Sequence, residues 1–178
     1  RIYLPGVQRH SMMRATGFKR AGAYDGTPFD VVVLAHDERH LRRKLLVLEH
    51  GDEVMVDLSA PVTLDNGDVL VLDDGRLAEV IAGEEDLYEV KGRDETHLME
   101  LCWHLGNRHL SCQIDRRSDP GRLLILRDHV IRDMLIGLGA EVTEVSEPFV
   151  PVRGAYHAPP HSHVHDHGHS HGHHHHHE

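Results

Sequence analysis

The chain has 178 residues, of which 39% are hydrophobic and only 4% aromatic, and its formal net charge is −10 with histidine neutral. This acidic balance argues against nucleic acid as a partner, because nucleic-acid-binding surfaces carry an excess of Lys and Arg. No apolar run approaches the roughly 20 residues that span a bilayer, so we expect no membrane segment. The two cysteines provide no disulfide framework and are typical of a reducing compartment, which predicts a cytoplasmic protein.

The first 24 residues contain five basic side chains and no acidic one. Such a composition can mark a targeting segment, but the apolar core of a signal peptide is missing. We interpret the segment as a basic first strand or arm.

From residue 30 to about 83, short apolar runs alternate with turn signals at a spacing near ten residues. Asn66-Gly67 and Asp74-Gly75 flank the run Val69–Leu72, and both dipeptides are typical of β-hairpins. No helical period is present, so the pattern predicts a small all-β domain over residues 1–83. The edges of such a domain can accept a partner strand or peptide.

Histidines in this first half occur beside charged residues and form no catalytic set. His36, His40 and His50 are therefore expected as solvated side chains at strand ends. The charged run 37–44 is expected as a solvated strand or loop.

After residue 84 the period changes, and two amphipathic helices alternate with short strands. The first helix is expected between the N-cap Asp94 and Gly106, and the second between Asp128 and Gly139. Their apolar stripes are Leu98, Leu101, Cys102 and Leu105, and Ile131, Met134, Leu135 and Leu138. Strands at 87–90, 110–114, 123–126 and 140–145 complete a β-α-β-β-α-β order. This predicts a ferredoxin-like domain over residues 84–150, with both helices on one face of an antiparallel sheet, and an α+β class for the whole chain.

Both cysteines, Cys102 and Cys112, fall on the inward side of these patterns. We interpret them as core residues, because no third or fourth cysteine is available to complete a zinc site.

Residues 151–178 form a histidine-rich tail, with 12 histidines among the last 22 residues of the chain. Its spacers are small or polar, so the segment is predicted to be disordered and to bind metal at many positions. Imidazole suits Ni²⁺, Zn²⁺ and Cu²⁺. An expression tag would explain only the uninterrupted run 173–177. The predicted ligands are His161, His163, His165, His167, His169, His171 and His173, with His157 as a secondary candidate.

Three histidines of the second half are further candidates. His104 ends the first helix, His109 follows Gly106-Asn107-Arg108 before a strand, and His129 begins the second helix. Each taken alone is more often structural than ligating, so His104 and His129 are secondary candidates.

The stretch 104–109 reads His-Leu-Gly-Asn-Arg-His and is followed by Gln113-Ile114. It resembles the HLGNRH signature of the UreE urease accessory proteins, a family of nickel metallochaperones. The resemblance extends over roughly residues 30–178, through Asp128-His129-Val130 and the segment 148–156, Pro-Phe-Val-Pro-Val-Arg-Gly-Ala-Tyr, into the tail. Val152 departs from the usual glutamate, and Arg127 stands where some members carry a further histidine.

This resemblance implies a nickel carrier and no enzyme. It implies a homodimer joined through the ferredoxin-like domain, with Ni²⁺ between the protomers on the two copies of His109. It also implies delivery to the urease apoprotein together with other urease accessory proteins, including a GTPase. Two readings from the residues stay open: a metal buffer or store without directed transfer, and a metal-dependent hydrolase, for which the chain lacks an H-E-x-x-H element.

Overall fold

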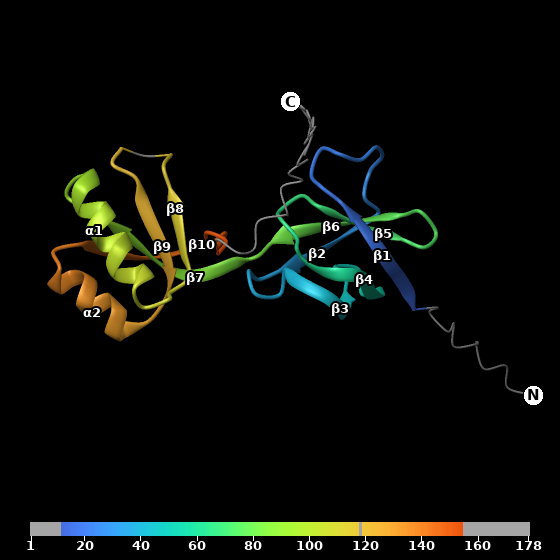
Figure 1. The fold of residues 1–178 in the computed structure, drawn as a ribbon. Coiled ribbons are helices and arrows are strands. Elements are labelled where there is room, and N and C mark those ends of the chain that lie inside the picture. The colour runs from blue at the N-terminus through green and yellow to red at the C-terminus, as the bar shows by residue number, and fades with distance from the viewer. Residues whose placement is uncertain (1–11, 118, 155–178) are drawn as a thin grey trace, which may run out of the picture.

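The computed structural model describes residues 12–117 and 119–154, which form two domains arranged side by side (Figure 1). A six-stranded sheet builds the N-terminal domain, and a four-stranded sheet with two helices builds the C-terminal domain. Strand β6 ends at Ala82 and β7 begins at Glu84, so a single glycine, Gly83, separates the two sheets along the chain. The predicted α+β class is confirmed. The histidine-rich tail beyond residue 154 lies outside the described residues.

The N-terminal domain is entirely β, as its ten-residue spacing of turns predicts. Its strands are β1 (Met13–Lys19), β2 (Asp30–Leu34), β3 (His40–Val47), β4 (Glu53–Thr63), β5 (Val69–Leu72) and β6 (Leu77–Ala82), in the sheet order β2-β6-β5-β1-β4-β3. Strand β1 lies between β4 and β5, parallel to the former and antiparallel to the latter. The basic first segment thus provides a central strand, with Ala15 fully buried.

The two glycine dipeptides play different roles. Asp74-Gly75 joins the antiparallel neighbours β5 and β6 in a tight turn, as predicted. Asn66-Gly67 does not close a hairpin, because β1 separates β4 from β5 in the sheet. The Asn66 side chain accepts a hydrogen bond from the Ala82 N–H at 2.8 Å, and the Gly67 N–H donates to Val80 O. This turn therefore anchors a crossover to β6, and the hairpin expected there was wrong.

The charged run 37–44 becomes a turn followed by the first half of β3. Along that strand Leu41 and Leu46 are buried while Arg42 and Arg43 are exposed. A register shift between Leu41 and Arg43 interrupts the strict alternation of the strand, so both arginines are exposed and the run is a solvated strand.

The C-terminal domain has the ferredoxin-like topology that the element order predicts. It consists of β7 (Glu84–Lys91), α1 (Glu95–Gly106), β8 (Cys112–Asp115), β9 (Arg122–Leu126), α2 (His129–Gly137) and β10 (Glu141–Pro148). All strand pairs are antiparallel, in the order β10-β7-β9-β8. Both helices lie on the same face of the sheet (Figure 1). Asp94 and Asp128 cap them by accepting backbone N–H groups, as expected.

The two domains contact each other around Phe149, which follows β10 and is fully buried beside Leu87 and Leu124. The ring of His36 meets the Phe149 ring edge-on at 4.9 Å between centroids. His36 also donates its backbone N–H and presents its ring Nδ1 to the two carboxylate oxygens of Glu85, each at 2.8 Å. The expectation of a freely solvated His36 was wrong, because β7 brings a carboxylate to it from 49 residues away. His40 and His50 are exposed, as expected.

Candidate metal-binding site

His109 lies in the turn that follows α1. The His109 N–H donates to Gly106 O at 2.9 Å, and the Leu110 N–H donates to Leu105 O at 3.3 Å. These two bonds form the Schellman motif that closes many helices, and the residue at its left-handed position is usually glycine. Here that residue is His109, with φ of 55°. Gly106 is the last residue of the helix, as expected, and it lies three residues before the left-handed position.

The left-handed conformation reverses the direction of the chain and leaves the His109 side chain outside the core. His109 is exposed, whereas Leu105 on one side is fully buried and Leu110 on the other packs against the same core. A non-glycine residue in this backbone conformation costs about 1 kcal/mol or more. Core packing does not compensate for this backbone strain, because the exposed His109 side chain contributes little to the core. An exposed imidazole held on a rigid helix end is suited to binding a ligand from solution.

His104 lies one turn earlier and is half-buried. Its ring meets the Trp103 ring edge-on at 5.1 Å, and its carbonyl oxygen accepts a hydrogen bond from the Arg108 guanidinium at 3.0 Å. His129 is exposed at the first position of α2. Within residues 12–117 and 119–154, no group of three or more His, Cys, Asp or Glu side chains is arranged to hold a metal ion. His157, His161, His163, His165, His167, His169, His171 and His173 lie outside the described residues.

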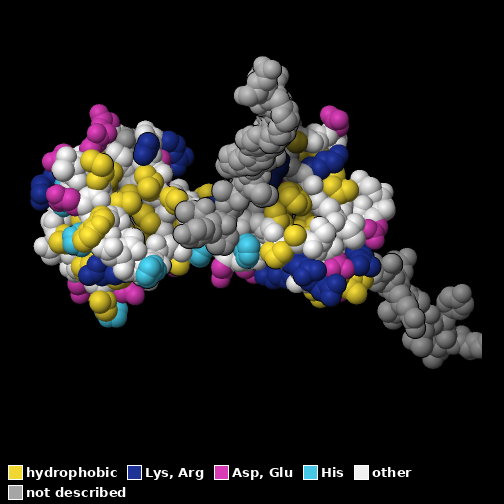
Figure 2. Space-filling view, in the orientation of Figure 1, with side chains coloured by type: hydrophobic (Ala, Val, Ile, Leu, Met, Phe, Trp, Pro, Cys, Tyr) yellow, Lys and Arg dark blue, Asp and Glu magenta, His cyan; other side chains and the backbone are white. Residues whose placement is uncertain are grey.

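An apolar ridge lies on the outer side of α1. Met99 and Trp103 stand one helical turn apart, and each is 64% exposed. The core stripe of the helix, which includes Leu101 and Leu105, faces the opposite way. Figure 2 shows hydrophobic side chains gathered on the surface of this domain. The sequence reasoning missed this ridge, although the i, i+4 spacing of a methionine and a tryptophan outside the core stripe was a usable signal.

His97 was also missed, and it is structural. It is buried at 4% exposure, its Nδ1 accepts the Arg93 N–H at 3.0 Å, and its Nε2 donates to Leu138 O at 2.9 Å. Both ring nitrogens are therefore used inside the fold. The signal was its place four residues before Leu101, on the buried stripe of α1.

The cysteines behave as core residues. Cys102 and Cys112 are half-buried and pack against the same cluster as Leu101 and Leu105. Burial and the neighbouring Cys102 raise the pKa of the Cys112 thiol to about 12. A metal ligand must be the thiolate, so Cys112 is a poor ligand at neutral pH.

These features describe a two-domain protein whose ferredoxin-like domain exposes His109 and His129 and carries an apolar ridge on α1. Two family models match the chain: the N-terminal domain of the UreE urease accessory protein over residues 18–83 and its C-terminal domain over residues 85–177. Urease accessory protein UreE of Rhizobium rhizogenes is 62% identical over 147 residues, covering 83% of this chain and 86% of the relative. The protein of that name from Agrobacterium fabrum is 55% identical over 147 residues, covering 83% and 89%.

The chain therefore belongs to the UreE urease accessory protein family. This is a family of accessory metallochaperones and not of enzymes, so the hydrolase alternative is set aside. Among the described residues, no helix is long and apolar enough to cross a membrane.

Proposed function

We propose that this protein carries nickel to urease during assembly of the urease metal centre. Family membership supports a role in urease maturation, and the observation that carries the metal role is His109, exposed in a left-handed turn at the end of α1. The cytoplasmic location expected from the cysteines accompanies this proposal. The partners are the urease apoprotein and the other urease accessory proteins, including the GTPase.

The nickel site lies between two copies of the chain. One imidazole is a weak ligand, and the described part of one chain offers no three-donor group around it. A two-fold axis beside His109 supplies a second imidazole, because the symmetry-related copy of the same residue lies across the axis. The ridge of Met99 and Trp103 supports this arrangement, because two such ridges would bury each other's apolar surface and bring the two helix ends together.

The tail captures the ion and supplies the remaining ligands. Its histidines, from His157 to His177, raise the local concentration of imidazole around the paired site. Ligands drawn from a tail exchange more readily than ligands fixed in a core, which suits an ion that is handed on. We retain the predicted limits of 1–83, 84–150 and 151–178 for the β-domain, the dimerising metal domain and the tail. Zn²⁺ and Cu²⁺ are expected to bind the same nitrogen ligands in vitro.

The test is a Ni²⁺ titration of the metal-free protein by calorimetry, with the oligomeric state measured in parallel. A chain ending at residue 156 is expected to keep one tight ion per dimer, and the full chain to bind several more. His109→Ala is expected to weaken the tight site more than about 100-fold, beyond the roughly 10–100-fold cost of losing an outer-shell partner. His40→Ala, which removes another exposed histidine, is the matched control. An intact tight site in His109→Ala would refute the interprotomer assignment.

Delivery is tested separately from binding. Urease activation at limiting nickel is expected to fall when residues 157–178 are removed and to fall further with His109→Ala. If the protein only buffered nickel, an equal concentration of a free histidine-rich peptide would replace it in this assay. Such replacement would favour the storage alternative.

A further inference from the structure

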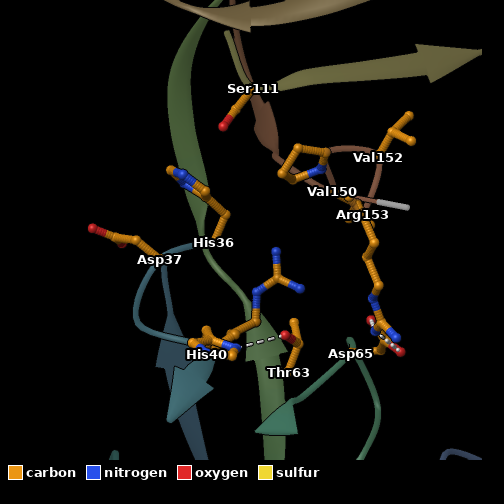
Figure 3. Close-up of a pocket in the computed structure, with 12 residues that line it drawn as sticks. His36, Asp37, His40, Thr63, Asp65, Ser111, Val150, Val152 and Arg153 are labelled. Carbon is orange, nitrogen blue, oxygen red and sulfur yellow. Dashed lines mark hydrogen bonds and ion pairs between the residues drawn. The ribbon is translucent and has the colours of Figure 1, made fainter. Parts of the chain in front are cut away.

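A cavity of about 320 Å³ opens between the two domains. From the N-terminal domain it is lined by residues of the turn before β3 and of the end of β4, and from the C-terminal domain by Ser111 and the segment 150–154. Figure 3 shows His36, Thr63, Ser111 and Arg153 around a common space. The cavity is thus built from segments that are far apart in sequence, and its shape depends on the docking of the two domains.

Arg39 reaches this cavity from the turn before β3 and is only 2% exposed. Its guanidinium donates to two backbone oxygens, Leu64 O in the N-terminal domain and Phe149 O in the C-terminal domain. Its Nε is buried and has no hydrogen-bond acceptor. No carboxylate of the described residues lies within ion-pair distance of it, whereas Arg153, the other arginine that lines the cavity, is paired with Asp65.

A buried guanidinium without a counter-charge is costly. Taking one ion out of water costs several kcal/mol, and two neutral carbonyl groups compensate only in part. An anion that enters the cavity would supply the missing charge in a setting of low dielectric constant, where the attraction is stronger than at the surface. The unpaired charge of Arg39 is therefore the feature that predicts a ligand.

The other residues of the cavity indicate which anion fits. Arg153 is already paired with Asp65 at 2.8 Å, and Asp37 adds a second negative charge at the rim. Only Arg39 is left to balance the charge of a ligand, so a ligand with one negative charge fits the cavity better than one with two. This favours a carboxylate over a phosphate dianion. Val150, Pro151 and Val152 provide an apolar wall for a hydrocarbon chain, and Ser111 provides a hydroxyl donor.

We propose that the cavity binds a carboxylate, with Arg39 as the charged group at its base. The carboxylate comes either from a peptide, as a chain terminus or an acidic side chain, or from a small free acid. This site is separate from His109 and does not depend on nickel binding. Because Arg39 touches both domains, a bound carboxylate would also hold them in one relative arrangement.

The test uses the full-length protein without added metal and without carboxylate buffers or chelators. Amide chemical shifts of Ser111, Val152 and Gly154 are followed by NMR during titration with three probes: N-acetyl-diglycine, its C-terminal amide, and acetate. A saturable shift with N-acetyl-diglycine and none with the amide is expected. Tighter binding of N-acetyl-diglycine than of acetate would identify a peptide as the source, and equal binding would identify a small acid. Inorganic phosphate binding as tightly as either carboxylate would overturn the assignment.

Two variants remove the site by different routes. Arg39→Gln removes the charge and is expected to weaken carboxylate binding about tenfold or more, the usual effect of losing a charged hydrogen-bond partner. Ser111→Trp places a large ring at the exposed rim and fills the cavity without touching the Arg39 contacts within the fold. Arg43→Gln, at an arginine whose side chain is 72% exposed, is the matched control and is expected to bind as the wild type does.

Since Arg39 also joins the domains, its variant is checked for folding by thermal unfolding. If Arg39→Gln does not fold, Ser111→Trp decides: wild-type affinity in that variant would refute the proposal. Absence of any saturable shift in the wild-type protein would refute it as well.

Discussion

Replacing His109 by glycine is expected to separate stability from metal binding. His109 occupies a left-handed backbone conformation, φ 55°, that costs a side-chain-bearing residue about 1–2 kcal/mol. Glycine removes that cost but loses about 0.5–1 kcal/mol through the larger entropy of its unfolded chain. The difference predicts that His109→Gly leaves the free energy of unfolding unchanged or raises it by up to about 1.5 kcal/mol, while abolishing the tight nickel site.

Urea unfolding of the metal-free protein, followed by circular dichroism, measures this difference. His109→Val is the matched comparison, because a β-branched residue fits the left-handed region worst. We expect Val to lie about 1–2 kcal/mol below Gly in stability, with the same slope against urea. If His109→Gly were less stable than the wild type by more than about 1 kcal/mol, the histidine would have to be a structural residue. The assignment of this turn to function would then fail.

Three further predictions address the fold. Leu105→Ala, at a fully buried position, is expected to cost about 2–5 kcal/mol of unfolding free energy, measured by urea unfolding. Hydrogen bonds from Arg117 and Arg122 hold the pKa of Asp115 well below its usual range, so this carboxylate stabilises the fold above pH 4 and loses that effect as pH falls. Arg122→Met is therefore expected to cost roughly 3 kcal/mol at pH 7 and clearly less at pH 2.5. If Arg122→Met lost the same unfolding free energy at both pH values, the assigned role of Asp115 would be contradicted. The hydrogen bond to Asp30 raises the pKa of His50. The His50–Asp30 pair therefore stabilises the fold fully below pH 6.5, and this stabilisation is lost as pH rises through the raised pKa. NMR titration should give His50 a lower pKa in Asp30→Asn than in the wild type.

The local patterns of the chain predicted much of the fold. The change from period two to period 3.6 near residue 84 identified both domain types, and Asp94 and Asp128 marked the starts of both helices. These signals succeed because caps and periodicity act over a few residues. The prediction of a hairpin at Asn66-Gly67 was wrong because this dipeptide occurs in any tight turn. Strand β1 pairs with both β4 and β5, so the two strands joined by this turn are not neighbours in the sheet.

In the candidate site, too, some features could be predicted from the sequence and others depended on the tertiary structure. The HLGNRH stretch pointed to His109 from sequence, but nothing local placed that residue in the left-handed position of the helix end, where glycine is the usual residue. The ridge of Met99 and Trp103 was missed, since apolar residues beside a core stripe are normally assigned to the core. Which of two apolar stripes is buried depends on where the sheet lies.

The sequence by itself determined the ferredoxin-like element order, the family and the abundance of imidazole in the tail, because each is a property of neighbouring residues. Only the tertiary structure decided that Arg39 reaches the backbone of Phe149, 110 residues away, and that His36 meets Glu85. Such contacts join groups with no fixed spacing along the chain, and their partners are selected by the packing of the two domains.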